Sequence, residues 1–391
     1  MKPGPAHAEP RARVAPFFDI EMLPAGHGDC LWIEYGDAAT THRWLIDCGT
    51  QQTAKTLLRR VEAVPQHQRF LELFVMSHID SDHIGGALPF FKAVQRGLRF
   101  GDVWFNGWRQ LAGQLGARQG EMFSTAIQDF ELPWNQWFGG RAVVVDGGNL
   151  PVYVLPGGMK LTLLSPTPLQ LKKLAPVWTR EMRRYGLEPG SRVDYGRFLK
   201  GTPSTSTDVD QLADSPFAGD AALPNGTSIA VLAEYGGAAA LLGADAHAPA
   251  LAASIRRLVG PGGRLKLDAF KVPHHASQNN LSAELLQLLD CRQYLVSTSG
   301  DYFSHPDREA IARIIKYGGD RPTLLFNYRS RYNEVWERPD LQERYRYLTR
   351  YPEGGREGAV VSLLPGSPSR APSPRGARST RAATGRVKSK P

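Results

Sequence analysis

The sequence is poor in cysteine, which excludes a fold built on disulfide bonds. Three cysteines occur among 391 residues, an odd number, and their spacing fits no metal-binding cysteine motif. Disulfide frameworks need paired cysteines and an oxidising compartment, so this chain suits a reducing one. We therefore expect Cys30, Cys48 and Cys291 to be buried as small apolar residues.

Long hydrophobic runs are also missing. The longest apolar stretches, such as Ser228 to Ala233 and Ala238 to Leu242, fall short of the roughly 20 residues needed to cross a bilayer. The N-terminus has scattered charge and proline but lacks the apolar centre of a secretory signal. We expect no transmembrane helix, no membrane partner and a cytoplasmic protein.

Acidic residues are absent from the end of the chain. Residues 365–391 are rich in Pro, Ser, Gly, Arg and Ala, and they carry seven of the net nine positive charges. The remainder of the chain is therefore nearly neutral, and its composition does not argue for a nucleic-acid partner. We expect a disordered basic tail, which serves either as a solubilising terminus or as a weak tether to a polyanion.

What is present is enough apolar sequence, 42% of the residues, to build a sizeable core. Phe17 to Asp47 has the pattern of an antiparallel meander, and Thr53 to Ala63 that of an amphipathic helix. Leu71 to Ser77 is expected to be a buried strand, and Ala87 to Arg96 a helix. A second series of strands and helices begins at Ser228, so we expect two sheets packed face to face with helices outside.

Two segments interrupt this pattern and are expected to be insertions. Residues 97–148 form an aromatic-rich segment, which either packs into the core or forms a wall beside a site. Residues 187–226 are dominated by Gly, Ser, Thr, Pro and Asp and read as a long loop or lid. The expected organisation is a flexible N-terminus at 1–15, one domain at 16–364 and the tail at 365–391.

The strongest chemical signal is a cluster of histidine and aspartate residues between the expected strand Leu71 to Ser77 and the expected helix Ala87 to Arg96. His78, Asp80, Asp82 and His83 place four metal-binding side chains within six residues. Imidazole and carboxylate together suit zinc or manganese, and alternating pairs can serve two neighbouring ions. Gly85 and Gly86 follow and permit close packing at the start of the helix.

Further ligands are expected at the ends of two later strands. Asp245 ends the apolar segment ALLGAD, and a carboxylate there can bridge two cations. His274 and His275 follow the strand LDAFKV. Because successive residues of an extended chain point in different directions, only one of these histidines need bind metal, and His275 is favoured.

Four other residues have weaker claims. His305, in FSHPD, is expected to face the substrate as a proton donor or charge-stabilising group. His27 and Asp29, in AGHGDC, can hold a ligand or the site loop in place. His247 is expected to start the next helix rather than to reach the site.

With these residues in hand, the chain resembles the metallo-β-lactamase fold superfamily, whose signature SHIDSDHIGG matches. It is most similar to the branch that contains the C-terminal hydrolase domain of the DNA-uptake protein ComEC and the bacterial phosphorylcholine esterases. The resemblance spans most of residues 17 to 330 and rests on several ordered segments: PAGHGDCLWIEY, WLIDCG, SHIDSDHIGG, LLSPTP, NGTSIAVL, LLGAD, FKVPHHAS and STSGDYFSHP.

The resemblance implies an α+β fold, a four-layer αβ/βα sandwich with its site at one edge of two packed sheets. It also implies one or two divalent ions, Zn²⁺ or Mn²⁺, held by a set of six ligands: His78, Asp80, Asp82, His83, Asp245 and His275. One departure stands out, because many superfamily members have a further histidine ligand before the bridging aspartate. This chain has no histidine between His83 and His247.

The expected function is hydrolysis by a metal-activated water, with phosphodiesters of the nucleic-acid or nucleotide type as the substrate class. Asp80 or Asp82 is expected to position the water, and His274 or His305 to steady charge or protonate the leaving group. Two alternatives remain. One is a carboxylic ester, lactone or thioester hydrolase, and the other is a non-catalytic binding module that keeps the metal for stability.

Overall fold

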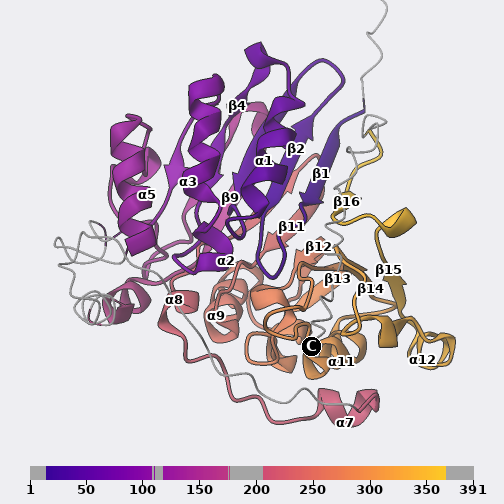
Figure 1. The fold of residues 1–391 in the computed structure, drawn as a ribbon. Helices are drawn as coiled ribbons and strands as arrows, with labels where there is room; N and C mark the ends of the chain where they lie inside the picture. Colours follow the sequence, from indigo (N-terminus) through magenta and orange to yellow (C-terminus); the bar gives the residue numbers. More distant parts are fainter. Residues whose placement is uncertain (1–14, 108–109, 111–117, 175, 177–205, 367–391) are drawn as a thin grey trace, which may run out of the picture.

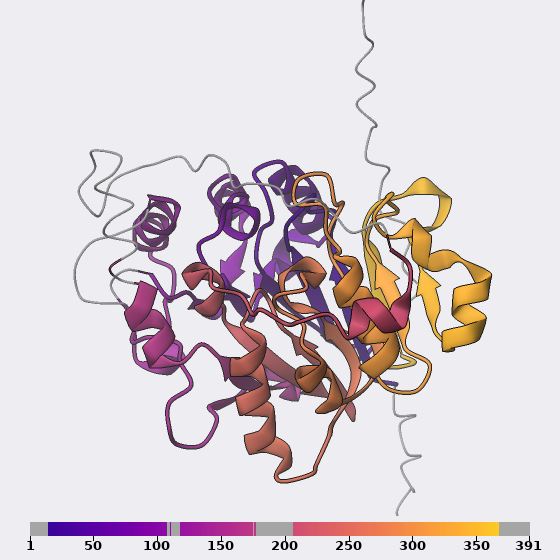
Figure 2. The same cartoon turned by 90° about the horizontal axis from the view of Figure 1, so that it is seen from below.

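The structure, a computed structural model, describes residues 15–107, 110, 118–174, 176 and 206–366. Two large β-sheets pack face to face, and helices cover the outer face of each (Figure 1). Figure 2 shows the layers from below: helices of the N-terminal half, the strands, and then helices of the second half. The architecture is the four-layer αβ/βα sandwich of α+β class expected above.

The first sheet comes mainly from the N-terminal part of the chain. β1, β2 and β3 form the expected antiparallel meander, and β5 and β7 continue it in parallel. The last described strand closes the other edge beside β1. The strand order is β16 (Ala359–Ser362), β1 (Phe17–Met22), β2 (Leu31–Gly36), β3 (Thr41–Ile46), β5 (Leu73–Val75) and β7 (Val103–Trp104).

The second sheet has eight strands and a parallel half. β11 to β15 run parallel to one another, whereas β8, β9 and β10 pair antiparallel. The order is β15 (Leu348–Arg350), β14 (Thr323–Phe326), β13 (Leu289–Val296), β12 (Leu265–Lys271), β11 (Ala238–Leu242), β10 (Ala230–Tyr235), β9 (Lys160–Ser165) and β8 (Val152–Val154). A small separate pair joins β4 (Phe70–Leu71) to β6 (Arg99–Phe100).

The helices lie outside the sheets. Those over the first sheet are α1 (Thr53–Glu62), α3 (Ala87–Phe90) and α5 (Arg118–Asp129), and α2 (Ser81–Ile84) lies at its edge. Further α-helices follow in the second half: α7 (Val209–Ala213), α8 (Leu223–Gly226), α9 (Ala248–Val259), α10 (Ala283–Gln287), α11 (Arg308–Tyr317) and α12 (Pro339–Tyr345).

Alternation along the strands of the first sheet divides its side chains between two apolar cores. In β2, Ile33 and Tyr35 face the second sheet, whereas Trp32 faces the helices. In β3, Trp44 faces the second sheet and Leu45 faces the helices. Successive side chains of a strand point to opposite faces, so each strand serves both cores and fixes the spacing of the layers.

The two expected insertions are more integrated than the sequence indicates. Within 97–148, β7 belongs to the first sheet, and Trp104 and Trp134 are buried, so packing is the alternative that the structure supports for them. Within 187–226, the described part contains α7 and α8 rather than a continuous loop, and α7 packs against α11. Residues 187–205, Trp108, the N-terminus and nearly all of the basic tail lie outside the described residues.

Two expectations from composition are confirmed. Cys30, Cys48 and Cys291 are buried free thiols. Among the described residues, no helix is both long and apolar enough to span a membrane.

Candidate metal centre

The His/Asp run follows β5, as the sequence predicts, but Asp82 and His83 lie within the short helix α2 and not in a loop. β5 ends at Val75, and the chain then carries His78 into the site before α2 begins at Ser81. Close backbone packing holds this segment: the position of a Cβ on Gly86 would lie 2.2 Å from the carbonyl oxygen of Cys48. A side chain there would clash with backbone, which explains the glycine.

The second sheet contributes the facing residues. Asp245 follows β11, and His274 and His275 follow β12. These two strands are parallel neighbours, with Leu242 opposite Lys271, so the segments that follow them emerge at the same edge of the sheet. The site therefore lies where the ends of both sheets meet.

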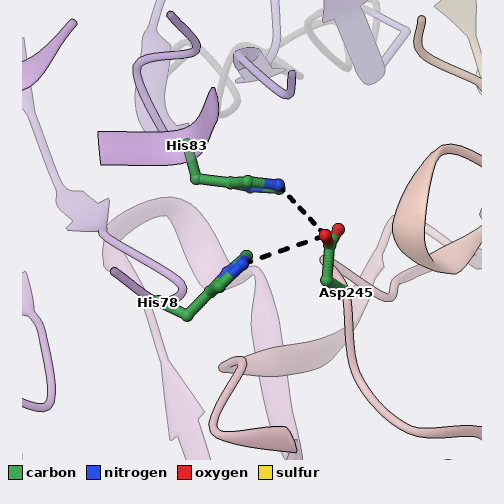
Figure 3. Close-up of side chains that lie close together, drawn as sticks. All are labelled: His78, His83 and Asp245. Atoms are coloured by element: carbon green, nitrogen blue, oxygen red, sulfur yellow. Dashed lines mark ion pairs between the residues drawn. The ribbon is translucent and has the colours of Figure 1, made fainter. Parts of the chain in front are cut away.

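The imidazoles converge on one carboxylate oxygen, Oδ2 of Asp245. The Nε2 atoms of His78 and His83 lie 3.8 Å and 3.3 Å from it (Figure 3). Nε2 of His275 is 3.8 Å from the same oxygen and 3.4 Å from Oδ2 of Asp82. Asp80, on the open side, places its Oδ2 3.6 Å from Nε2 of His78.

Two groups of three side chains bring their donor atoms within 4.8 Å of one another. One group is His78, His83 and Asp245, and the other is Asp82, His83 and His275. All of these residues are buried. The structure thus brings together five of the six residues proposed as ligands, with Asp80 beside them.

The histidine nitrogens that face the centre make no hydrogen bond within the described part of the chain. Nε2 of His78, His83 and His275 and Oδ1 of Asp245 are buried without a hydrogen bond among the described residues. Leaving such groups unpaired costs about 1 to 3 kcal/mol each, so they need a partner. Imidazole and carboxylate donors of this kind fit a zinc or manganese ion.

The opposite nitrogen of each ring is held by the protein. Nδ1 of His83 donates to Oδ2 of Asp47 at 2.8 Å, and Nδ1 of His275 donates to the carbonyl oxygen of Ser297 at 2.8 Å. Nδ1 of His78 lies 2.9 Å from Oγ of Ser77, which itself donates to Oδ2 of Asp47. With the Nδ1 proton committed in this way, each Nε2 lone pair is available to a cation.

Asp47 is a residue of the centre that the sequence did not single out. It follows β3 directly, has a φ of 59° and is fully buried. Its carboxylate accepts hydrogen bonds from both the N–H and the hydroxyl of Ser77 and from His83. Its position after the apolar segment WLI is the one signal the sequence offers, since strand ends often present functional side chains.

Asp29 lies behind His275, consistent with the supporting role predicted for it. Oδ1 of Asp29 is 3.4 Å from Nδ1 of His275, and the other oxygen pairs with the fully buried ammonium group of Lys271. Burial opposes the charge of Asp29, but Lys271 and His275 outweigh it and hold the pKa of Asp29 below its usual value. A fixed negative charge therefore supports the imidazole from outside the centre.

The electrostatics of the centre favour positive charge. Burial disfavours the charged form of His275, but Asp245 and Asp29 overcome it and raise the pKa of His275 to about 9. Burial likewise opposes a charge on His83, yet Asp245 and Asp47 raise its pKa. Burial alone would raise the pKa of Asp245, but three histidines hold it well below its ordinary value. A carboxylate whose pKa is lowered in this way stays negatively charged and is suited to holding a cation.

His274 also approaches the centre, where it was expected to act on charge or on the leaving group. His274 and His275 have φ values of 47° and 53°, and both approach Asp245. The alternation argument applies to extended chain, and this segment is a left-handed turn. Nε2 of His274 is 3.8 Å from Oδ2 of Asp245.

Asp220 is a second residue that the sequence did not mark. Its Oδ2 accepts hydrogen bonds from the side-chain amides of Asn225 and Asn280 and lies 3.6 Å from Nδ1 of His274. His247 approaches the same carboxylate at 3.8 Å, while its Nε2 donates to the carbonyl oxygen of Ala222. His247 also precedes α9 directly, as expected.

His305 and His27 lie at the rim. The ring centroid of His305 is 5.5 Å from that of His274, and Nδ1 of His305 donates to Oδ1 of Asp307 at 3.1 Å. His27 stacks on Tyr302 with ring centroids 4.7 Å apart, and burial lowers the pKa of His27. Both residues are half-buried beside the centre.

Comparison with known proteins gives structural neighbours only. No family model and no curated protein matches the chain. The chain is similar to the metallo-β-lactamase fold protein YhfI from Bacillus subtilis, with 12% identity, a TM-score of 0.40, and coverage of 89% of this chain and 99% of that one. It is also similar to the short form of human tRNase Z, with 10% identity, a TM-score of 0.39 and coverage of 88% and 99%.

A third neighbour is CmlA, a diiron β-hydroxylase from Streptomyces venezuelae, with 10% identity and a TM-score of 0.38. The match covers 90% of this chain and 55% of CmlA. At identities this low, the chemistry of the centre has to be argued from its own residues.

Proposed function

We propose that this chain is a metal-dependent hydrolase that acts on phosphodiester bonds of the nucleic-acid or nucleotide type. The observation that carries the proposal is a set of three buried Nε2 atoms that make no hydrogen bond among the described residues and are directed at one carboxylate oxygen, with each Nδ1 already held. Zn²⁺ and Mn²⁺ are the ions we propose for it. Such ions supply Lewis-acid polarisation of a substrate oxygen and acidify a water.

Three side chains have separate proposed roles beside the metal. Asp80 is the most exposed of the proposed ligands, with 39% of its side chain accessible, so its carboxylate is placed to orient a water on the open side. Asp82 is buried against His275 and fixes that ring in position. His305 is anchored at Nδ1 by Asp307, and the imidazolium form of the ring can donate its Nε2 proton to a leaving oxygen.

The choice of a phosphodiester rests on charge and on the resemblance to the branch of ComEC and the phosphorylcholine esterases. Anionic phosphoryl oxygens are stabilised most by a site where cations and imidazoles face the substrate.

The three cysteines are free and buried, which supports our proposal of a reducing, cytoplasmic location.

The test compares the wild type with Asp245→Asn after chelation and reconstitution with Zn²⁺ or Mn²⁺. Hydrolysis of bis(p-nitrophenyl) phosphate is expected to depend on the metal and to fall by at least about 100-fold in the variant, since even outer partners of metal ligands cost up to that much. Asp37→Asn is the matched control, because Asp37 caps the turn between β2 and β3. It should keep full activity.

Three other results have distinct meanings. Turnover of p-nitrophenyl acetate but not of the phosphodiester would move the assignment to a carboxylic ester hydrolase. Metal binding without turnover of either substrate would support the non-catalytic binding module. Metal-independent turnover, unaffected by Asp245→Asn, would contradict the proposed centre altogether.

A further inference from the structure

A row of side-chain rings leads from the surface of the protein to the metal centre. Tyr302 meets Phe303 with ring centroids 4.6 Å apart, and Phe303 meets His305 at 6.1 Å. The ring of His305 lies 5.5 Å from that of His274, whose Nε2 is 3.8 Å from Oδ2 of Asp245. The outer end of the row therefore borders the space in which a substrate would approach the centre.

Tyr302 is the exposed end of this row. Its residue is 44% accessible, although its ring stacks on His27 with centroids 4.7 Å apart and an angle of 22° between the ring planes. His27 interacts electrostatically with three residues of the centre: Asp82, His83 and His275. An isolated exposed ring needs no explanation, but this one is the open end of a packed cluster beside a reactive centre.

The loop that carries these rings is anchored to the centre at both ends. At its start, the N–H of Ser299 donates to the carbonyl oxygen of Gly26 at 2.7 Å, in the turn that contains the stacked histidine. After it, the N–H of Asp307 donates to the carbonyl oxygen of Ala276 at 3.0 Å, next to the adjacent histidines. Because the loop is held in this way, a ligand that stacks on its rings does not have to order it first.

A cation lies against the same loop. Oγ of Ser304 donates to the hydroxyl group of Tyr332 at 3.2 Å, and the exposed Arg331 donates to that hydroxyl at 2.6 Å. The guanidinium group of Arg331 also lies 4.8 Å from the centroid of the Tyr332 ring. Arginine held in this way can bind a phosphate group beside the aromatic cluster.

We propose that Tyr302, stacked on His27, is a platform for a nucleobase of the substrate, and that Arg331 binds a flanking phosphate. The inference rests on the proposed function and narrows its substrate to a single-stranded nucleic acid. Aromatic rings that stack bases, together with cations along the backbone, are typical of single-strand binding and tolerate any base, since every base has a π-face. A base within a duplex is already stacked on its neighbours and is not free to use the platform.

The test compares the binding of two labelled strands that differ only in their bases. One is a fluorescein-labelled oligothymidylate, and the other is an abasic strand of the same length. Fluorescence anisotropy is measured on the metal-free full chain, so that neither strand is cleaved. The wild type should bind the oligothymidylate at least about fivefold more tightly, the lower end of what one stacked base contributes. The backbone and the basic tail act on both strands, so the ratio isolates the bases.

Three variants locate the effect. Tyr302→Ala should bring the ratio to about one, whereas Tyr302→Phe keeps the ring and should keep the ratio. Arg331→Gln should weaken both strands equally and lower the salt dependence of binding by about one charge. Tyr345→Ala is the matched control, because this half-buried tyrosine ends α12 and its hydroxyl group donates to Asp210. It should show the wild-type ratio.

The outcomes separate this inference from the proposed function. Equal binding of the two strands by the wild type, or an unchanged ratio in folded Tyr302→Ala, would overturn the platform, while metal-dependent turnover of bis(p-nitrophenyl) phosphate would still support the hydrolase. Base-dependent binding through Tyr302 without any metal-dependent turnover would support the platform and remove the hydrolase.

A second comparison tests another occupant of the same rings. Quaternary ammonium groups also bind aromatic faces, and the exposed Asp301 would supply the opposite charge. Metal-loaded enzyme is therefore given thymidine 5′-(p-nitrophenyl phosphate) and p-nitrophenyl phosphorylcholine, which share a leaving group. We expect the higher kcat/KM for the thymidine ester and a loss of that preference in Tyr302→Ala. A preference for the choline ester that is lost in Tyr302→Ala would overturn the nucleobase assignment.

Discussion

Oδ2 of Asp47 accepts a hydrogen bond of 2.8 Å from Nδ1 of His83, and this contact determines where the other nitrogen of the ring points. Nε2 of His83 lies 3.3 Å from Oδ2 of Asp245, the shortest of the contacts between imidazole and carboxylate around that oxygen. Through Ser77 the same aspartate also reaches His78. One carboxylate from β3 thus orients two rings that follow β5.

Asp47→Asn is expected to weaken metal binding by about 10- to 100-fold, the range for loss of a partner behind a metal ligand. Asparagine tolerates the φ of 59° at this position, so the turn itself should be retained. The amide removes the negative charge that fixes the protonated Nδ1 of His83. Calorimetric titration of the chelated variant with Zn²⁺ measures the change.

Asp102→Asn is the control for that experiment. Asp102 is also fully buried, but it lies at the start of β7, at the opposite end of the sheet from the centre, and binds backbone N–H groups of Gln136 and Trp137. Its variant should alter stability without altering metal affinity. Equal losses of affinity in both variants would mean that Asp47 acts through general stability alone.

The buried pair of Lys271 and Asp29 gives a prediction about stability. Both side chains are almost completely inaccessible, at 0% and 1%. Lys271→Met leaves the carboxylate of Asp29 buried without its cation, which is expected to cost about 3 to 5 kcal/mol. The double variant with Asp29→Asn removes both charges and should recover most of that loss.

Urea unfolding of the metal-free proteins gives these free energies. Metal-free protein is needed because an ion on His275 would add its own stabilisation. If the double variant were no more stable than Lys271→Met, the charge of Asp29 would not be the source of the loss. Lost packing around the lysine stem would then explain it.

The sequence revealed those parts of the centre whose signal is local. His78, Asp80, Asp82 and His83 are close in the chain, and Asp245 and His275 each follow an apolar strand. Asp47 could not be recognised in this way, because it is 36 residues from His83 and meets it only after β3 and β5 pair. The hydrogen bond between Asp47 and His83 forms only in the tertiary structure.

Non-local pairing also limits what can be predicted of the fold. The place of β16 beside β1, at the other end of the chain, comes only from the structure. Asp220 lies in a polar segment that resembles a loop by composition. The preference for His275 over His274 as a ligand rested on extended-chain alternation, whereas both residues lie in a left-handed turn.

Trp104 provides a test of the aromatic segment. Its ring is fully buried, and it meets the rings of Trp137, Phe138 and Tyr153 at centroid distances of 5.9, 5.2 and 5.3 Å. Trp104→Ala is expected to lower the free energy of unfolding by about 3 to 5 kcal/mol, because it leaves a large cavity. Metal affinity of the folded variant should be unchanged.

Val154→Ala is the control on the neighbouring edge strand, because 60% of Val154 is exposed. Its effect should stay within about 0.5 kcal/mol. A drop in phosphodiester turnover by Trp104→Ala in protein that remains fully folded would instead favour the substrate-wall alternative for this segment.

The three cysteines give a prediction from their pKa values. Burial raises the pKa of the Cys291 thiol to about 12, and burial with nearby carboxylates raises those of Cys30 and Cys48. At pH 8 about one Cys291 in ten thousand is then a thiolate, the form that reacts with disulfide reagents. We expect negligible modification of the folded protein by Ellman's reagent and rapid modification of all three after unfolding.

The same shifts give the protein a dependence on alkaline pH. A folded-state pKa above the unfolded value of about 8.5 means that the native protein keeps protons which the unfolded chain releases. The stabilisation is complete below pH 8.5 and is lost as the pH rises toward 12, the folded value for Cys291. Urea unfolding at pH 7.5 and pH 10 should therefore show a decline that Cys291→Ala reduces. An equal decline in that variant would show that other groups cause it.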